Sequence, residues 1–277
     1  MNLPLNPSPN SRPIGIFDSG VGGLTVARQL RRVLPHEDLL YLGDTARVPY
    51  GTKSPATVVR FACEDTGFLV GRDVKAVVVA CNTASAWALE ELQQRFTLPV
   101  FGVILPGAAA ALRRTRTGRI GVIGTPATIR SEAYTRAILG QRADARVFAR
   151  ACPLLVPLVE EGWVNHRVSR LVLEEYLRPL LRQRIDTLVL GCTHYPLLKR
   201  VIRQVVGPDV ALIDSAESCA RHVAEQLQLR TLLTAHRTAG ELRACLTDET
   251  TRFTQVARRF LGEPVAPAEK VELAGVD

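Results

Sequence analysis

Short apolar runs alternate with helical patterns along most of this chain, and no other feature constrains the fold as strongly. The runs are apolar on both faces, which is typical of parallel strands covered by helices on either side. We therefore predict an α/β fold with mainly parallel sheets flanked by helices. The expected strands are 14–17, 39–42, 76–80, 99–103, 119–124, a short one near Val147, 187–191 and 210–214. The expected helices are 22–34, 55–70, 83–95, 126–139, 168–184 and 195–206, and the rest after 214 is expected to be mostly helical.

A weak internal repeat divides the chain. IGIFDSGVGG (14–23) resembles IGVIGTPATI (120–129), and AVVVACNTAS (76–85) resembles LVLGCTHYPL (188–197). This repeat predicts two similar α/β units that each offer one cysteine. The domains we predict are 13–103 plus 214–265 for the first and 104–213 for the second, with a disordered tail over 1–12 and a flexible C-terminal tail over 266–277.

Two of the six cysteines occupy matched positions. Cys81 directly follows the run AVVVA, and Cys192 directly follows TLVLG, so both are expected at the carboxyl end of a parallel strand. Open α/β sheets bind ligands at that edge. The helix that follows is expected to lower the pKa of such a thiol toward the reactive range. We interpret this pair as functional and the other four as structural: Cys63, Cys152, Cys219 and Cys245.

The cysteine spacing and the termini exclude several classes of protein. No two cysteines form a Cys-x-x-Cys pair, so redox motifs and the usual zinc spacings are not supported, and we expect no metal. The N-terminus lacks the pattern of a signal peptide, and no apolar run reaches the roughly 18 residues that span a bilayer. We therefore expect a cytoplasmic protein with free thiols and no membrane partner.

The net charge of +8 suggests an anionic partner only weakly. The arginines are scattered, and the nearest approach to a cluster, at 113–119, lies at an expected helix end where cations complement the dipole. Aromatic residues make up 5% of the chain, which leaves little stacking surface for single strands. We expect no requirement for nucleic acid.

Other polar residues at strand ends each allow a structural and a functional interpretation. The loop DSGVGG (18–23) permits close backbone approach to an anion, but it is not a G-x-G-x-x-G nucleotide motif. Asp18 fits a helix N-cap or an acid–base partner of Cys81, and His194 could orient or protonate Cys192. The remaining candidates have structural alternatives as turn formers, helix caps or solvated acids: Asp44, Tyr50, Gly51, Thr125, Thr128, Glu160 and Glu161.

Four segments in this order resemble the signature segments of glutamate racemase, in the aspartate/glutamate racemase superfamily. They are IFDSGVGGLTV, YLGDTARVPYG, VVACNTASA and LVLGCTHYPLL. The similarity extends from about Ile14 to Asp214, with a further family-like stretch, RFTQVARRFLG (252–262). The resemblance implies two pseudo-twofold related domains with the active site in the cleft between them, and activity without any cofactor. It also implies a bacterial homodimer that supplies D-glutamate for peptidoglycan, and hence for the cell wall and cell shape.

The resemblance also implies roles for individual residues. Cys81 would remove the α-proton of D-glutamate and Cys192 that of L-glutamate. Asp18 would assist Cys81, whereas Glu160, rather than Glu161, and His194 would assist Cys192. The substrate-binding positions would be Asp18, Ser19, Tyr50, Gly51, Asn82, Thr83, Thr125, Thr128, Thr193 and His194, with Asp44 as possible support. The C-terminal extension, EPVAPAEKVELAGVD, is expected to be dispensable.

Three alternatives stay open at this point. A two-cysteine racemase of another substrate, such as aspartate or a hydantoin, would share the motifs. A thiol hydrolase would use Cys192 as nucleophile and His194 as base, but it leaves Cys81 unexplained. A two-lobed solute-binding protein would bind glutamate without turnover.

Overall fold

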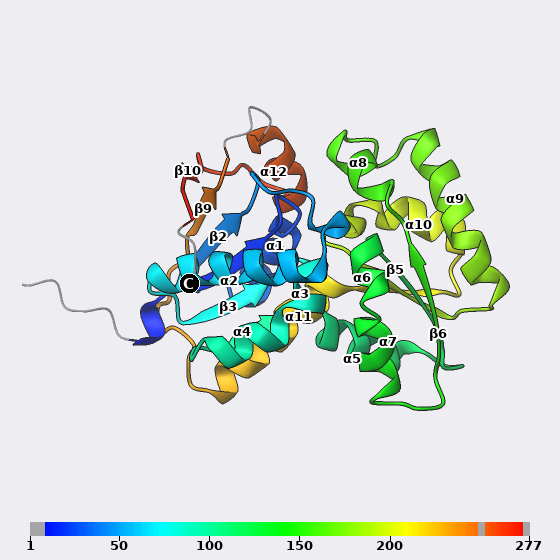
Figure 1. The fold of residues 1–277 in the computed structure, drawn as a ribbon, viewed down its shortest axis with the longest axis horizontal. Coiled ribbons are helices and arrows are strands. Elements are labelled where there is room, and N and C mark those ends of the chain that lie inside the picture. The colour runs from blue at the N-terminus through cyan, green and yellow to red at the C-terminus, as the bar shows by residue number, and fades with distance from the viewer. Residues whose placement is uncertain (1–8, 249–252, 274–277) are drawn as a thin grey trace, which may run out of the picture.

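The structure, a computed structural model, describes residues 9–248 and 253–273 and contains two parallel sheets (Figure 1). The larger sheet has the order β10-β9-β2-β1-β3-β4, and the smaller has the order β6-β5-β7-β8. Every strand pair within the described residues is parallel. We call the larger sheet with its helices the first lobe and the smaller sheet with its helices the second lobe. The predicted fold class is confirmed.

The strands have the following bounds. In the first lobe they are β1 (Ile14–Asp18), β2 (Leu39–Gly43), β3 (Ala76–Val79), β4 (Val100–Gly102), β9 (Leu242–Leu246) and β10 (Glu269–Lys270). In the second lobe they are β5 (Arg119–Gly124), β6 (Arg146–Ala151), β7 (Thr187–Gly191) and β8 (Ala211–Asp214). Every residue of β1, β2, β3 and β7 is buried, which accounts for their two-sided apolar sequences.

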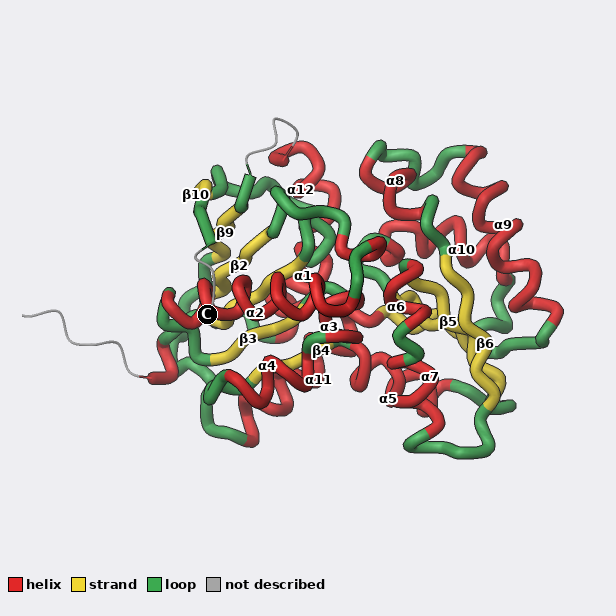
Figure 2. The backbone as a smooth tube through the Cα atoms, in the orientation of Figure 1, coloured by secondary structure: helices red, strands yellow, loops and turns green. Residues whose placement is uncertain are grey.

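Helices cover both sheets, as the red segments of Figure 2 show. They are α1 (Leu24–Val33), α2 (Pro55–Gly71), α3 (Asn82–Trp87), α4 (Leu89–Arg95), α5 (Ile104–Arg114), α6 (Pro126–Arg130), α7 (Ala133–Leu139), α8 (Leu155–Glu160), α9 (Arg167–Arg182), α10 (Lys199–Val206), α11 (Ser215–Leu229) and α12 (Phe253–Leu261). Short 3-10 helices span Pro9–Ser11, Tyr50–Thr52 and Tyr195–Leu198. Helix α1 packs against both α11 and α12, so the C-terminal part of the chain returns to the first lobe.

Several local expectations differ from the structure. The predicted helix over 126–139 is divided in two, because Glu132 adopts a left-handed conformation with φ of 55°. The predicted helix over 83–95 is likewise divided at Ala88. The expectation of mostly helix after 214 was wrong for 242–246, which form strand β9 beside β2. Arg243 interrupts the apolar residues of this segment, so no continuous apolar run marks the strand. Helix α8 had not been expected.

Both predicted tails include residues that have regular secondary structure. Residues 9–11 form a 3-10 helix, and β10 within the expected C-terminal tail pairs with β9. The Arg72 guanidinium donates to both carboxylate oxygens of Glu269, at 3.2 and 2.7 Å, and so fastens β10 to the end of α2. Residues 1–8 and 274–277 lie outside the described part, and the exact domain boundaries stay a prediction.

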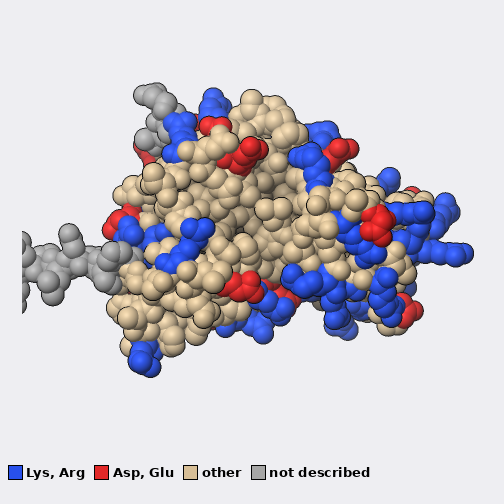
Figure 3. Space-filling view, turned by 90° about the horizontal axis from the view of Figure 1, so that it is seen from below, with Lys and Arg blue, Asp and Glu red and all other residues tan. Residues whose placement is uncertain are grey.

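Surface charge and helix length bear on possible partners. On the face seen in Figure 3, Lys and Arg side chains are spread over both lobes with acidic residues among them. Within 9–248 and 253–273, the structure contains no helix with the length and apolar character needed to cross a lipid bilayer.

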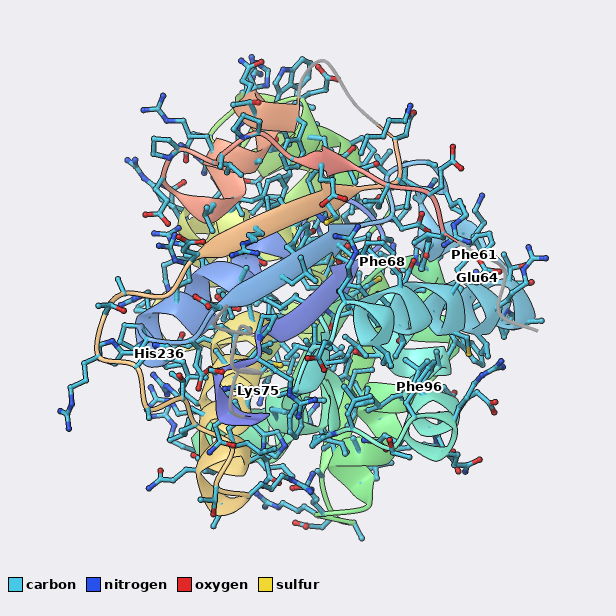
Figure 4. All side chains as sticks on the ribbon, turned by 90° about the vertical axis from the view of Figure 1, so that its left-hand side faces the viewer. Phe61, Glu64, Phe68, Lys75, Phe96 and His236 are labelled. Carbon is cyan, nitrogen blue, oxygen red and sulfur yellow. The ribbon has the colours of Figure 1, made fainter. Side chains whose placement is uncertain are left out.

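A buried ion pair lies at the amino end of the larger sheet. Lys75, labelled in Figure 4, and Glu37 are nearly inaccessible, and Lys75 Nζ lies 2.5 Å from Glu37 Oε2. Lys75 Nζ also donates to the carbonyl of Asn10 at 2.6 Å, and Glu37 Oε1 accepts from the Thr234 backbone N–H at 2.7 Å. The pair thus joins the N-terminal turn, the start of β3, the turn before β2 and the segment after α11.

We predict that Lys75→Met lowers the free energy of unfolding by about 3–5 kcal/mol, because it leaves the Glu37 carboxylate buried without its cation. Urea denaturation measures this loss. Arg170→Met, which breaks an exposed pair with Glu174, is the control and should cost no more than about 1 kcal/mol. Equal losses in both variants would contradict a special role for the buried pair.

Candidate active site

The carboxyl ends of the two sheets face each other between the lobes. Helix α3, which follows β3, contacts α6, which follows β5 (Figure 1). Thr83 Oγ1 lies 2.9 Å from Thr125 Oγ1 across this boundary, and Thr25 Oγ1 donates to the Thr193 carbonyl at 3.0 Å. The structure therefore brings the predicted residues of both repeats into one place.

Cys81 lies at the N-cap of α3, directly after β3. Its side chain is buried, and its Sγ lies 3.6 Å from Ser19 Oγ at the end of β1. Burial raises the pKa of Cys81 to about 12, and the Asp18 carboxylate adds to this rise, while the Ala84 N–H and Ser19 oppose it. The expectation of a lowered pKa was therefore wrong for Cys81: the loss of hydration outweighs the N-terminus of a six-residue helix.

Asp18 ends β1 with a carboxylate that is only partly satisfied. Its Oδ2 accepts from the Gly20 N–H at 3.1 Å, whereas its Oδ1 is buried with no hydrogen-bond partner in the described part of the chain. Helix α1 begins after Gly23 without a side-chain cap, so the alternative role of Asp18 as an N-cap is not seen. Burial raises the pKa of Asp18, and the nearby His194 opposes this rise. A proton or a ligand can occupy the free oxygen.

Cys192, His194 and Glu160 form a connected chain on the second lobe. Cys192 Sγ lies 3.9 Å from His194 Nδ1, and His194 Nε2 lies 3.0 Å from Glu160 Oε1. Burial lowers the pKa of His194, but the hydrogen bonds and charges of Cys192 and Glu160 outweigh it and raise this pKa to about 10. The imidazole is therefore protonated at neutral pH, and both ring nitrogens donate. Glu160 ends α8, and its side chain is 49% exposed.

Polar side chains at the boundary between the lobes are held by hydrogen bonds to one another and to Tyr134. The hydroxyls of Thr83, Thr125 and Thr128 form a triangle with sides of 2.9, 3.0 and 2.9 Å. Thr125 also caps α6, as expected, by accepting from the Thr128 N–H. Asn82 Oδ1 accepts from the Tyr134 hydroxyl at 2.8 Å. Tyr134 was not predicted as a site residue, because a tyrosine within α7 gives no local signal of this contact.

The loop after β2 is held by a buried cluster behind the site. The Tyr50 hydroxyl donates to Asp65 Oδ2 at 2.9 Å and also contacts Asp44. Arg47 pairs with both carboxylates, at 2.7 Å from Asp44 and 3.1 Å from Asp65. Asp44 and the phenol of Tyr50 thus hold this loop in place, and the support of the site by Asp44 stays a prediction. Sequence reasoning missed Asp65, although it follows Phe61 by four residues on the buried face of α2.

Two glycines allow the lobes to approach closely. A Cβ at Gly51 would lie 2.9 Å from Thr125 Cβ. A Cβ at Gly22 would lie 2.3 Å from Thr193 Oγ1 and 2.5 Å from the ring of His194. The glycine-rich loop of the first lobe therefore packs directly onto the histidine of the second, which is a further reason for glycine in DSGVGG.

Comparison with known proteins identifies the family. Residues 24–223 match the family described as Asp/Glu/Hydantoin racemase. The chain belongs to this family. It is 52% identical to a glutamate racemase from Syntrophus aciditrophicus over 266 residues, which cover 96% of this chain and 98% of that relative. This member is accordingly an amino-acid racemase, an isomerase.

Solved structures agree with this assignment. A glutamate racemase from Bacillus anthracis has a TM-score of 0.92 and 41% identity to this racemase, over 95% of this chain and 98% of its own. One from Francisella tularensis, in complex with D-glutamate, has a TM-score of 0.90 and 39% identity over the same shares. The predicted resemblance is confirmed.

We predict that Gly22→Ala lowers the racemase activity at least about 10-fold, because its methyl group pushes Thr193 and His194 away and a shift of 1 Å can cost up to about 10²-fold. Steady-state kinetics of the purified variant measure this loss. Gly71→Ala, whose methyl group meets nothing within 4 Å, should keep full activity. Full activity in Gly22→Ala would contradict this close packing.

Proposed function

We propose that this racemase interconverts L-glutamate and D-glutamate without a cofactor, with Cys81 and Cys192 as the two acid–base groups. One observation carries the proposal: two cysteines, each with its own polar partners, converge from separate lobes on one buried site. The relatives named as glutamate racemases, one of them in complex with D-glutamate, support glutamate as the substrate.

Inversion requires one group that removes the α-proton and another that returns a proton to the opposite face. A thiolate and a thiol provide this pair, and their roles exchange with the direction of reaction. From L-glutamate, Cys192 takes the α-proton as a thiolate and Cys81 gives its proton to the other face of the carbanion. The product is D-glutamate, with Cys192 now a thiol and Cys81 a thiolate, so the protons balance.

The settings of the two thiols fit these roles. The raised pKa of Cys81 keeps it a thiol in the empty site, as a proton donor must be. The imidazolium of His194 lies within hydrogen-bond distance of Cys192 and places a positive charge beside its sulfur. In the reverse direction, Asp18 beside Cys81 offers its free carboxylate oxygen as the acceptor for the thiol proton.

The carbanion-like state also needs electrostatic stabilisation. The hydroxyls of Thr83 and Thr193, the amide of Asn82 and the backbone N–H groups near Ser19 and Gly51 supply donors for the substrate carboxylates in this proposal. Because most of these groups are buried, each hydrogen bond acts in a medium of low polarity and is stronger than in water.

The decisive experiment is incubation of the purified protein with L-glutamate in deuterated water. We expect D-glutamate to appear with deuterium at its α-carbon and no added cofactor. Absence of both D-glutamate and deuterium would overturn the proposal. Faster turnover of aspartate than of glutamate would assign the enzyme to another substrate of the family.

We predict that Cys81→Ala and Cys192→Ala each lower the racemisation rate by at least about 10²-fold, since each removes one proton-transfer group. Conversion of each enantiomer, followed by circular dichroism, measures this. Cys219→Ala, which removes a buried thiol of the first lobe outside the proposed mechanism, is the control and should stay active. Full racemisation in either Cys81→Ala or Cys192→Ala would overturn the two-thiol mechanism.

We predict that Glu160→Gln shifts the alkaline limb of the pH–rate profile to lower pH. The carboxylate raises the pKa of His194, so its removal lowers that pKa and the imidazolium loses its proton at lower pH. The pH dependence of kcat for L-glutamate checks this. Glu161→Gln is the matched control, because His194 Nε2 bonds to Glu160, and it should leave the limb in place.

The biological setting is a further part of the proposal. We infer that the enzyme acts in the bacterial cytoplasm as a homodimer and supplies D-glutamate for peptidoglycan. Depletion of the protein should then stop growth and distort cell shape, and added D-glutamate should restore both. Sedimentation of the purified protein as a monomer would overturn the dimer.

A further inference from the structure

Helix α12 comes from the first lobe but contacts the acid–base chain of the second. The Arg259 guanidinium donates through Nη1 to the carbonyls of Val159 and Glu160, at 3.1 and 3.0 Å. These carbonyls belong to the last residues of α8, where a cation is favourable. The guanidinium therefore acts as a C-cap that is supplied by the other lobe.

A glycine makes room for this cap. Gly162 has a φ of +82°, and a Cβ there would lie 2.7 Å from Arg259 Nη2. Glycine at this position both ends α8 and lets the guanidinium reach the helix carbonyls. The position of Glu160 at the end of α8 is therefore fixed by a residue about one hundred positions further along the chain.

The next residue of α12 contacts the histidine itself. Phe260 is fully buried, and its ring lies 4.9 Å from that of His194 with an interplanar angle of 79°. Such an edge-on arrangement is favourable for aromatic pairs, and a cationic imidazole strengthens it. Because both nitrogens of His194 are engaged, by Cys192 and by Glu160, the phenyl ring fixes the plane in which both hydrogen bonds form.

We propose that Arg259 and Phe260 are positioning residues for the Cys192 half of the reaction. Arg259 places Glu160, and Phe260 sets the ring plane of His194. Within the described residues, neither side chain bonds to Cys81 or its partner Ser19, whose positions depend on β1, β3 and α3. Helix α12 therefore affects proton transfer by Cys192 and not proton transfer by Cys81. This inference rests on the proposed two-thiol function.

Racemisation rates alone cannot reveal a one-sided effect. The enantiomers have equal free energies in water, so the equilibrium constant is one and kcat/KM must be equal in both directions. Any variant therefore lowers both values together. The test needs a reaction that uses one thiol at a time.

Elimination of chloride from 3-chloroglutamate is such a reaction. The thiolate removes the α-proton, the Cα–H electron pair forms the Cα=Cβ double bond, and the C–Cl bond breaks with release of chloride. The enamine product then hydrolyses to 2-oxoglutarate and ammonia. The L form should need only Cys192 as the base, and the D form only Cys81.

The wild type and the two cysteine variants test the proposed function first. We expect wild-type protein to release chloride from both enantiomers, Cys192→Ala to lose the L reaction and Cys81→Ala to lose the D reaction. Any other pattern would overturn the two-thiol function itself, whatever the α12 variants do.

The α12 variants then test the inference. Arg259→Met and Phe260→Leu should slow chloride release from L-3-chloroglutamate by about 10- to 10²-fold and leave the D reaction unchanged, since small misplacements of a catalytic group cost this much. Arg258→Met, which removes an exposed cation from the same helix, is the matched control and should change neither reaction. Arg259→Lys should restore part of the L rate.

Equal slowing of the L and D reactions in Arg259→Met or Phe260→Leu would overturn the inference, because it would show a general structural role. Unchanged L rates would overturn it as well. Urea denaturation shows whether each variant is folded under the conditions of the rate measurements. For Phe260→Leu, the pH profile of the L reaction should also change, because His194 is displaced, whereas a merely structural loss would keep the profile.

Discussion

The hydrogen bonds between the lobes hold the rest of the site in place. Thr83 contacts Thr125 and Thr128, and Thr25 contacts the carbonyl of Thr193, so the carboxyl ends of two separate sheets face each other. Each sheet alone presents one cysteine on an edge. Only their juxtaposition brings the two buried thiols within electrostatic reach of each other. A side chain at Gly22 or Gly51 would prevent the lobes from approaching this closely.

The two halves are related in architecture but not in electrostatics. Cys81 lies beside a hydroxyl and a buried carboxylate, which together with burial favour its protonated form. Cys192 lies beside a protonated imidazole that is held by a carboxylate. A single buried carboxylate costs free energy, and the opposite charge of His194 reduces the cost at Asp18. Two thiols with the same backbone setting therefore have charged neighbours of opposite sign.

Much of this arrangement follows from the sequence, because strand ends and helix starts are local signals. The alternation of apolar runs predicted both sheets, and the positions of Cys81 and Cys192 after those runs predicted the shared edge. Contacts made by distant segments gave no such signal: Tyr134 on Asn82, Asp65 on Tyr50, and Phe260 on His194. The pKa of Cys81 could not be predicted either, because it depends on burial that only the closed lobes produce. The strand β9 was missed because Arg243 interrupts its apolar residues, so the segment shows no continuous apolar run.

The burial of both thiols has a consequence for the enzyme between turnovers. In the proposed mechanism, conversion of L-glutamate leaves a proton on Cys192 and none on Cys81, which suits D-glutamate rather than another molecule of L-glutamate. Because the residues Cys81 and Cys192 are only 6% and 5% exposed, we expect their protons to exchange slowly with water while the lobes are closed. The proposed mechanism therefore gives the free enzyme two protonation isomers, and we expect their interconversion to become a distinct kinetic step when substrate is abundant.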